Sequence, residues 1–260
     1  MLHAISYETG GGIVERTGEG WRLRLPSLNG AAYANAQIDD YGSGSSRFAF
    51  ARRPPETLRL RARFSHCFEE LHGTAGFGFW NHPLAPGGGL APRSLWFFHG
   101  SRESDLQFAR GVPGHGFKAA LFDALPLLPA WRLPGTAQRS GIGASTPAAA
   151  PGAIERAAVW LLRRRTLVAL GVRTVQRIAH AREQMLDIDA TQWHEYELDW
   201  RADRAVWRID GREVFRAPHP PRGPLGFVAW IDNYRAHFTR DGRFGFDVGA
   251  APHEQWLEIV

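Results

Sequence analysis

Three polar side chains alternate along residues 103–108, which read Glu-Ser-Asp-Leu-Gln-Phe. Successive side chains of a strand point to opposite faces, so this spacing predicts a strand with Glu103, Asp105 and Gln107 on one face. Two carboxyl groups on one face can supply a nucleophile or a general acid and base. His99 lies just before them, and its imidazole titrates near neutral pH. Glu103, Asp105 and His99 are therefore the candidate catalytic residues, although a solvated strand face shows the same pattern and a lone histidine is more often structural.

Two other segments set acidic and amide groups beside aromatic rings at a strand end. Residues 37–41 read QIDDY and residues 230–234 read WIDNY. Such sets suit the hydroxyl groups of a sugar, or a structural calcium held by oxygen ligands, although turns also favour Asp and Asn. No metal-ligand spacing is present, so no other metal and no cofactor is expected. The candidate ligand-binding residues are Asp39, Tyr41, Trp80, Asn81, His82, Trp96, Gln107, Trp230, Asp232 and Asn233.

Short strands must position these residues, because apolar and polar side chains alternate through most of the chain. Residues 57–64 alternate in this way, as do residues 193–200, and Asp210-Gly211 is typical of a hairpin turn. Further strands are predicted at 21–25, 36–41, 75–81, 94–99, 104–109, 116–122, 225–231, 243–248 and 254–260. Many short strands separated by Gly and Pro predict an all-β sandwich.

One region breaks this pattern. Residues 123–152 are rich in Pro, Ala, Gly and Ser, which predicts a loop, and residues 153–186 show helical spacing of apolar residues. We therefore expect residues 1–260 to form one domain, with a loop-plus-helix insertion over about 120–190. The alternation resumes after it, at Trp193.

The net charge of +5 belongs to this insertion, since residues 153–183 contain seven arginines and two glutamates and the remainder is balanced. The helix could be a solvated surface helix, a cap over the ligand face, or a peripheral contact with an anionic membrane. Nucleic acid is not an expected partner, because the rest of the chain has no net positive charge.

Other features of composition exclude several classes of protein. No apolar stretch is long enough to span a membrane, and the single Cys67 excludes an internal disulfide. No signal peptide is visible, which predicts a cytoplasmic protein, or a secreted one if a leader was trimmed.

The stretch WHEYELDWRADRAVWRIDGREVFR resembles the concanavalin A-like lectin/glucanase superfamily, and in particular the family-16 glycoside hydrolases. In that family a Trp-His-x-Tyr strand pairs with a strand ending in Asp-Gly, as Trp193, His194, Tyr196, Asp210 and Gly211 do here. AQIDDY, LRLRARFS and GTAGFGFWNHP follow the same order upstream, so the resemblance covers about 30–110 and 190–250. It implies a jelly-roll β-sandwich with a concave face. It says little about activity, because many members only bind.

The family places its catalytic carboxyl groups on one strand as Glu-x-Asp-x-Glu. The resemblance implies that Glu103 is the nucleophile, that Asp105 is its partner, and that Gln107 occupies the acid/base position. An amide cannot protonate a leaving oxygen, so the motif is degenerate and ordinary hydrolysis is expected to be impaired.

Two functions follow. The first is a glucanase-like protein that binds, and in one version processes, a carbohydrate or glycosylated ligand on a concave aromatic face. The alternative is an intracellular enzyme of the isomerase, cyclase or hydratase type that acts on a hydrophobic small molecule beneath a helical cap. The missing acid/base residue and the apolar insertion favour the second function, and the resemblance favours the first.

Overall fold

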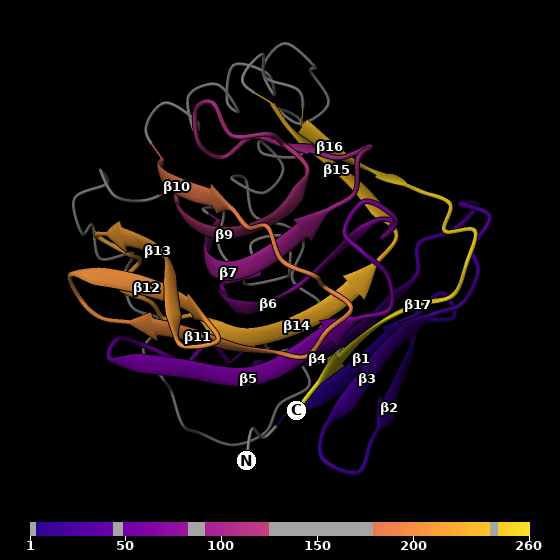
Figure 1. Ribbon diagram of the computed structural model, residues 1–260, viewed down its shortest axis with the longest axis horizontal. Coiled ribbons are helices and arrows are strands. Elements are labelled where there is room, and N and C mark those ends of the chain that lie inside the picture. Colours follow the sequence, from indigo (N-terminus) through magenta and orange to yellow (C-terminus); the bar gives the residue numbers. More distant parts are fainter. Residues whose placement is uncertain (1–3, 44–48, 83–91, 125–178, 240–243) are drawn as a thin grey trace, which may run out of the picture.

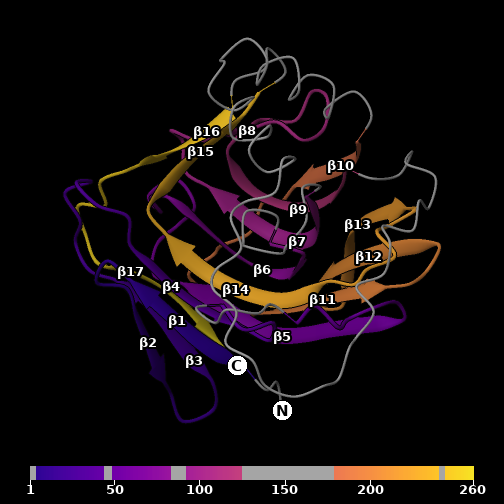
Figure 2. The same cartoon turned by 180° about the vertical axis from the view of Figure 1, so that it is seen from behind.

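The computed structural model describes residues 4–43, 49–82, 92–124, 179–239 and 244–260. In these ranges the chain forms seventeen strands and no helix, arranged in two seven-stranded sheets and one three-stranded sheet (Figures 1 and 2). The two large sheets share one apolar core, so the predicted all-β sandwich is confirmed. Within the described residues no helix could cross a membrane.

Sheet A is antiparallel and has the order β1-β4-β14-β6-β7-β9-β10. Its strands are β1 (Ile5–Thr9), β4 (Asn35–Asp39), β14 (Gly226–Asp232), β6 (Thr74–Trp80), β7 (Arg93–Gly100), β9 (Gly116–Asp123) and β10 (His180–Met185). Figure 1 shows the long strands curving towards the side on which the three-stranded sheet lies. We call this side of sheet A the concave face.

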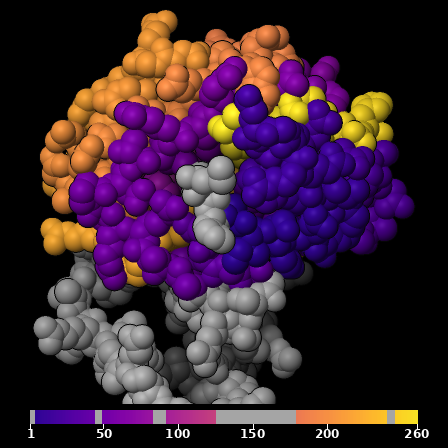
Figure 3. Space-filling view, turned by 90° about the horizontal axis from the view of Figure 1, so that it is seen from below, coloured from indigo at the N-terminus to yellow at the C-terminus, as the bar shows by residue number. Residues whose placement is uncertain are grey.

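Sheet B has the order β13-β12-β11-β5-β17-β3-β2. Its strands are β13 (Arg212–Pro218), β12 (Arg204–Ile209), β11 (His194–Trp200), β5 (Glu56–Phe64), β17 (Gln255–Ile259), β3 (Trp21–Leu25) and β2 (Ile13–Arg16). Figure 3 views the molecule from the side of β5, with the N-terminal strands and the β11–β13 region on either side of it. On the outer face Arg63 lies over the rings of Trp193, at 4.9 Å, and Trp256, at 5.3 Å.

The core lies between sheets A and B, as the alternation in 57–64 and 193–200 predicts. Strand β5 buries Leu58, Leu60, Ala62 and Phe64 and turns its arginines outward. The largest fully buried side chains include Phe77, Phe79, Phe97, Phe117 and Phe227 from sheet A, and Tyr196, Trp200 and Trp207 from sheet B. Burial of these rings stabilises the sandwich.

The three-stranded sheet consists of β16 (Phe244–Val248), β15 (Tyr234–Phe238) and β8 (Asp105–Leu106). Its Leu106 and Phe238 join Phe98 and Phe122 of sheet A in a second apolar cluster. The cluster also contains Trp230, with Trp80 and Trp96 packed against it, so the protein itself fills part of the concave face.

Residues 180–185 form strand β10, which corrects the prediction of helical structure up to residue 186. Pairing with β9 makes this segment a strand. It places the buried Glu183 next to Lys118, with which it forms an ion pair. Residues 125–178, which hold most of the predicted loop and arginine-rich helix, lie outside the described residues.

Candidate functional site

The pairing register decides which side chains share the concave face, because directly opposed residues of a sheet point to the same side. One row across sheet A contains Tyr7, Gln37, Trp230, Gly76, Phe98 and Lys118. The next row contains Ile5, Asp39, Val228, Gly78, Trp96, Ala120 and Glu183. Trp80, in the following row, completes the set. The sequence candidates Asp39, Trp80, Trp96 and Trp230 are thus brought onto one face.

Trp80, Trp96 and Trp230 form a compact group that we call the tryptophan cluster. The ring centroids of Trp96 and Trp230 are 5.5 Å apart, those of Trp80 and Trp96 are 6.0 Å apart, and Trp80 lies parallel to Trp230 at 6.3 Å. Trp230 is 8% exposed, whereas Trp80 and Trp96 are more exposed.

Glycine in β6 leaves room for these rings. Gly76 and Gly78 occupy concave positions between the strands that carry Trp230 and Trp96. A Cβ would lie 2.2 Å from the carbonyl oxygen of Phe97 at Gly76, and 2.3 Å from that of Leu95 at Gly78. Because β7 approaches so closely, a larger residue does not fit, and the space above β6 is left to the indole rings.

A polar network borders the cluster. The Tyr41 hydroxyl accepts hydrogen bonds from Trp80 Nε1 at 2.7 Å and from Gln37 Nε2 at 3.2 Å. The Asp39 carboxylate accepts from Gln37 Nε2 at 2.9 Å and from the backbone amides of Tyr41, Gly42 and Ser43. Both Asp39 oxygens accept hydrogen bonds within the protein, and the role that the structure shows for Asp39 is to fix a turn. No three His, Cys, Asp or Glu side chains of the described ranges could together hold a metal ion.

Asn81 and His82 follow Trp80 at the end of β6. The His82 ring stacks on Trp80 at 4.6 Å, and burial lowers the pKa of His82, so the ring is neutral at pH 7. The Asn81 Oδ1 accepts a hydrogen bond from the Arg93 amide at 3.0 Å, which joins the end of β6 to β7. His82 thus belongs to the aromatic site, and Asn81 supports it.

Asp232 and Asn233 are buried supports at the end of β14. Asp232 Oδ1 accepts hydrogen bonds from Thr74 Oγ1 at 2.8 Å and from the amides of Thr74 and Tyr234. Asn233 is 0% exposed and makes three hydrogen bonds to backbone groups of Ala32, Ala34 and Gly249. Both were expected to meet ligand, and in the structure both instead hold the chain together.

Burial raises the pKa of Asp232 to about 7, against the hydrogen bonds that favour its ionised form. The folded state then binds this proton more tightly than the unfolded chain does. The contribution of Asp232 to stability is therefore fully present below pH ~4 and lost as pH rises to 7, with a slope of up to about 1.4 kcal/mol per pH unit. We expect Asp232→Asn to flatten this part of the curve of unfolding free energy against pH, measured by urea denaturation. A curve with the same slope in both proteins contradicts the assignment.

The part of the concave face that the protein itself fills contains a buried ion pair. Lys118 Nζ lies 3.1 Å from Glu183 Oε2 and donates to the Leu106 carbonyl at 3.1 Å, while Glu183 Oε1 accepts from the Ala109 amide at 2.8 Å. Both side chains are fully buried. Burial lowers the pKa of Lys118 and raises that of Glu183, and each charge offsets the shift of the other. The pair fastens β10 and the segment after β8 to β9.

The predicted row Glu103, Asp105 and Gln107 is only partly formed. Strand β8 begins at Asp105, whose carboxylate accepts a hydrogen bond from Gln107 Nε2 at 2.8 Å. Glu103 lies in the turn before the strand, and its Oε1 is 3.9 Å from His72 Nδ1. The expected arrangement of Glu103 and Asp105 along one strand is therefore wrong, because pairing with β15 starts two residues later.

His99 does not share a surface with Glu103, which corrects that expectation. It alternates with Leu95 and Phe97 on the inner face of β7, stacks on Phe68 at 5.4 Å, and is 0% exposed. Its Nε2 donates to the Leu71 carbonyl at 3.0 Å, and burial lowers its pKa to about 4. His99 is a neutral histidine of the core.

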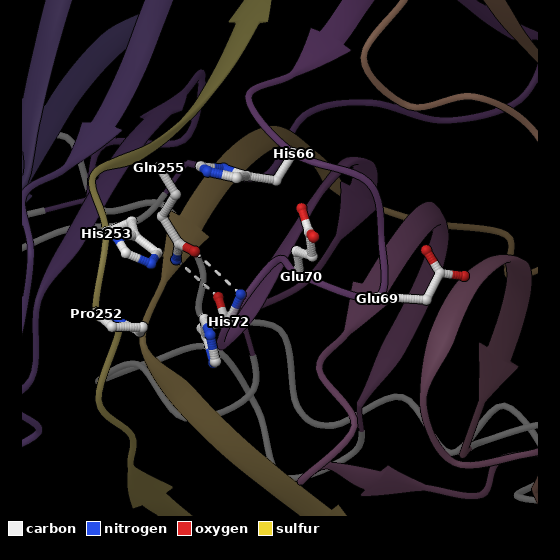
Figure 4. Close-up of a pocket in the computed structure, with 7 residues that line it drawn as sticks. All are labelled: His66, Glu69, Glu70, His72, Pro252, His253 and Gln255. Atoms are coloured by element: carbon white, nitrogen blue, oxygen red, sulfur yellow. Dashed lines mark hydrogen bonds between the residues drawn. The ribbon is translucent and has the colours of Figure 1, made fainter.

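Glu103 instead borders a cleft whose lining includes none of the three tryptophans of the cluster. Two adjoining pockets of about 420 and 270 Å³ share His72 and Pro252. Figure 4 shows the larger pocket, lined by His66, Glu69, Glu70, His72, Pro252, His253 and Gln255, with Gln255 hydrogen-bonded to the backbone of His72. Partial burial acts to raise the pKa of Glu103, but hydrogen bonds and the charges of His72 and Arg235 hold it below its usual value. A carboxylate ionised at neutral pH is not poised to act as a general acid.

Sequence reasoning missed several residues around the concave face. Tyr7 and Tyr33 were not candidates, and the pair of Lys118 with Glu183 was not foreseen. The structure places Lys118 at a concave position of β9, and nothing local in the sequence indicates that its partner is 65 residues away.

No protein-family model matches the chain. A search of curated proteins likewise gives no match.

Comparison with solved structures finds laminarinases and endo-glucanases. A laminarinase from Flavobacterium sp. UMI-01 has 10% identity and a TM-score of 0.44, over 95% of this chain and 78% of that one. SCLam, a non-specific endo-β-1,3(4)-glucanase, has 11% identity and a TM-score of 0.45, over 95% and 71%. A family-16 endo-glucanase from Bacteroides ovatus has 8% identity and a TM-score of 0.42, over 99% and 93%. The likeness concerns the arrangement of strands alone.

Proposed function

We propose that the protein binds a carbohydrate or glycosylated ligand at the tryptophan cluster on its concave face. The observation that carries this proposal is the convergence of three indole rings and His82 on one face, where the buried hydrogen bonds of Tyr41 and Gln37 fix the position of Trp80. An apolar floor with a few fixed polar groups is the usual composition of a small-molecule site. Aromatic faces suit the C–H face of a sugar ring.

The buried indole N–H of Trp96 adds support. Among the residues that the structure describes it has no hydrogen-bond acceptor, although it is shielded from water. A buried donor without a partner costs about 1–3 kcal/mol, which a ligand oxygen at this position would offset.

The carboxyl groups favour binding over hydrolysis by the usual retaining mechanism. That mechanism needs two carboxyl groups about 5–5.5 Å apart at the scissile bond. The concave positions of β4, β14, β6 and β7 carry two carboxyl groups, those of Asp39 and Asp232, and the protein's own donors engage both. Glu103 borders the separate cleft.

Trp96→Ala is expected to weaken binding of the best ligand at least about tenfold, because it removes both a stacking face and the free N–H. The measurement is titration calorimetry with the best ligand from a panel of neutral and charged oligosaccharides, including β-1,3- and β-1,4-linked glucans. Trp193→Ala, which removes an indole from the outer face of sheet B, is the matched control and should bind normally.

Absence of binding to every saccharide of the panel would contradict the proposal. Tight binding of an apolar probe that Trp96→Ala abolishes, with no saccharide binding, would favour the alternative of a hydrophobic small molecule. Glu103→Gln should leave the affinity of a saccharide unchanged.

A further inference from the structure

Asn29 lies in the loop between β3 and β4 and differs from the other asparagines of the chain. Three of the four asparagines are at most 3% exposed, namely Asn35, Asn81 and Asn233. Asn29 is exposed, and it is the one asparagine that a glycine follows. An asparagine carboxamide can react with the backbone nitrogen of the next residue, and a glycine there leaves the approach open because it has no Cβ.

The turn at Asn29 brings the two reacting groups together. The Asn29 Oδ1 atom accepts a hydrogen bond from the Ala31 amide at 3.0 Å, which folds the carboxamide back along the Gly30 peptide. This bond also stabilises the negative charge that develops on Oδ1 when a nucleophile attacks Cγ. Within the described ranges neither the Gly30 amide nor Asn29 Nδ2 donates a hydrogen bond, so the attacking nitrogen and the leaving nitrogen are both unrestrained.

The fold requires glycine at position 30. Gly30 has a φ of +80°, and a Cβ there would lie 2.9 Å from the backbone nitrogen of Ala250. A residue with a side chain would therefore be strained at this position. By contrast, the buried carboxamides of Asn81 and Asn233 are held by backbone groups that are distant in the sequence. The fold thus keeps the reactive pair at the surface and shields the other asparagines.

Asp210 is a useful comparison, because Gly211 follows it and the same ring closure is possible there. Its carboxylate accepts a hydrogen bond from the Glu195 amide at 2.9 Å and lies 2.7 Å from His194 Nδ1. Partial burial acts to raise the pKa of Asp210, but these hydrogen bonds and the charge of His194 hold it below its usual value. An ionised carboxylate resists attack by a nucleophile, so the turn at Asp210 should be inert.

We propose that Asn29 is a site of spontaneous deamidation through a succinimide. The Gly30 amide gives its proton to hydroxide, its nitrogen forms a bond to Asn29 Cγ, and the bond from Cγ to Nδ2 breaks as ammonia leaves with a proton from water. Water then opens the succinimide at either carbonyl, which gives aspartate or isoaspartate. The net reaction consumes one water and releases one ammonia. It adds a carboxylate to a loop that packs against Gly249 and Ala250, which line the smaller pocket.

The test incubates the full folded chain at mildly alkaline pH and follows its mass and the ammonia released. Masses of proteolytic fragments locate the change, and tryptophan fluorescence shows that the chain stays folded. Asn29 should deamidate before any other asparagine, within about tenfold of the rate of a synthetic peptide of residues 25–34. Asn29→Gln should release ammonia at least about tenfold more slowly, because its carboxamide carbon would have to close a larger ring.

Three results would overturn the proposal. One is a mass increase that maps first to Asn35, Asn81 or Asn233. Another is a folded chain that deamidates more than about tenfold more slowly than the peptide, since the fold would then protect Asn29. The third is equal release of ammonia by Asn29→Gln and the wild type. Because Asn29 is exposed, this variant should fold, and isomerisation at Asp210 leaves the mass unchanged and does not disturb the readout.

Discussion

Lys118→Met is expected to lower the free energy of unfolding by about 3–5 kcal/mol, because it leaves the carboxylate of Glu183 buried without its partner. The substitution also removes the donor to the Leu106 carbonyl. Methionine keeps the length and apolar character of the lysine stem, so the effect reports the lost charge and not a cavity. The measurement is urea denaturation followed by tryptophan fluorescence and circular dichroism.

The double variant Lys118→Met/Glu183→Gln is the control. It buries no charge and keeps an acceptor for the Ala109 amide, so it should recover most of the loss. The single variant should also become more stable as pH falls, since its folded state binds a proton at Glu183 more tightly than the unfolded chain does. A single variant within about 1 kcal/mol of the wild type would show that this pair does not fasten β10.

Asn233→Ala is the second change with a large expected effect, a loss of about 3–6 kcal/mol. The substitution orphans the buried Ala34 amide and the carbonyls of Ala32 and Gly249, at an average cost of about 1–2 kcal/mol each, because Ala32 is exposed and water can reach its carbonyl. These groups belong to the segments before β4 and after β16, which the Asn233 side chain holds at the end of β14. Thermal and urea unfolding measure the loss.

Asn29→Ala is the matched control, because Asn29 is exposed and its single hydrogen bond to the Ala31 amide is local. It should cost less than about 1 kcal/mol. If Asn233→Ala remained stable but lost ligand affinity, Asn233 would be a binding residue, as the sequence suggested, and not a support.

Local alternation was enough to predict the sandwich. In β5 and β11 successive side chains point to opposite faces of the sheet. The face that carries the apolar side chains is the one that packs in the core. The same rule brought Trp80, Trp96 and Trp230 together, because their strands are neighbours and the rings stand at concave positions.

Parity did not reveal where a strand begins or which of its faces meets the core. The side chain of His99 lies on the same face of β7 as those of Leu95 and Phe97. This face packs on sheet B, so His99 is in the core. Glu103 lies two residues before the first residue of β8, and its carboxylate lies near His72. Residues 180–185 have helical spacing but form a strand, because they pair with β9. This contact is distant in sequence, so a short stretch of sequence cannot reveal it.

The arginine-rich composition has a consequence for chemical labelling. Lys118 is the chain's only lysine, and its amine is enclosed between β9, β10 and the segment after β8. Reagents that acylate or crosslink amines therefore find no accessible lysine on the folded protein. Acylation of Lys118 requires local unfolding of the region where β9, β10 and the segment after β8 meet. The rate of acylation therefore measures local unfolding at this one natural position.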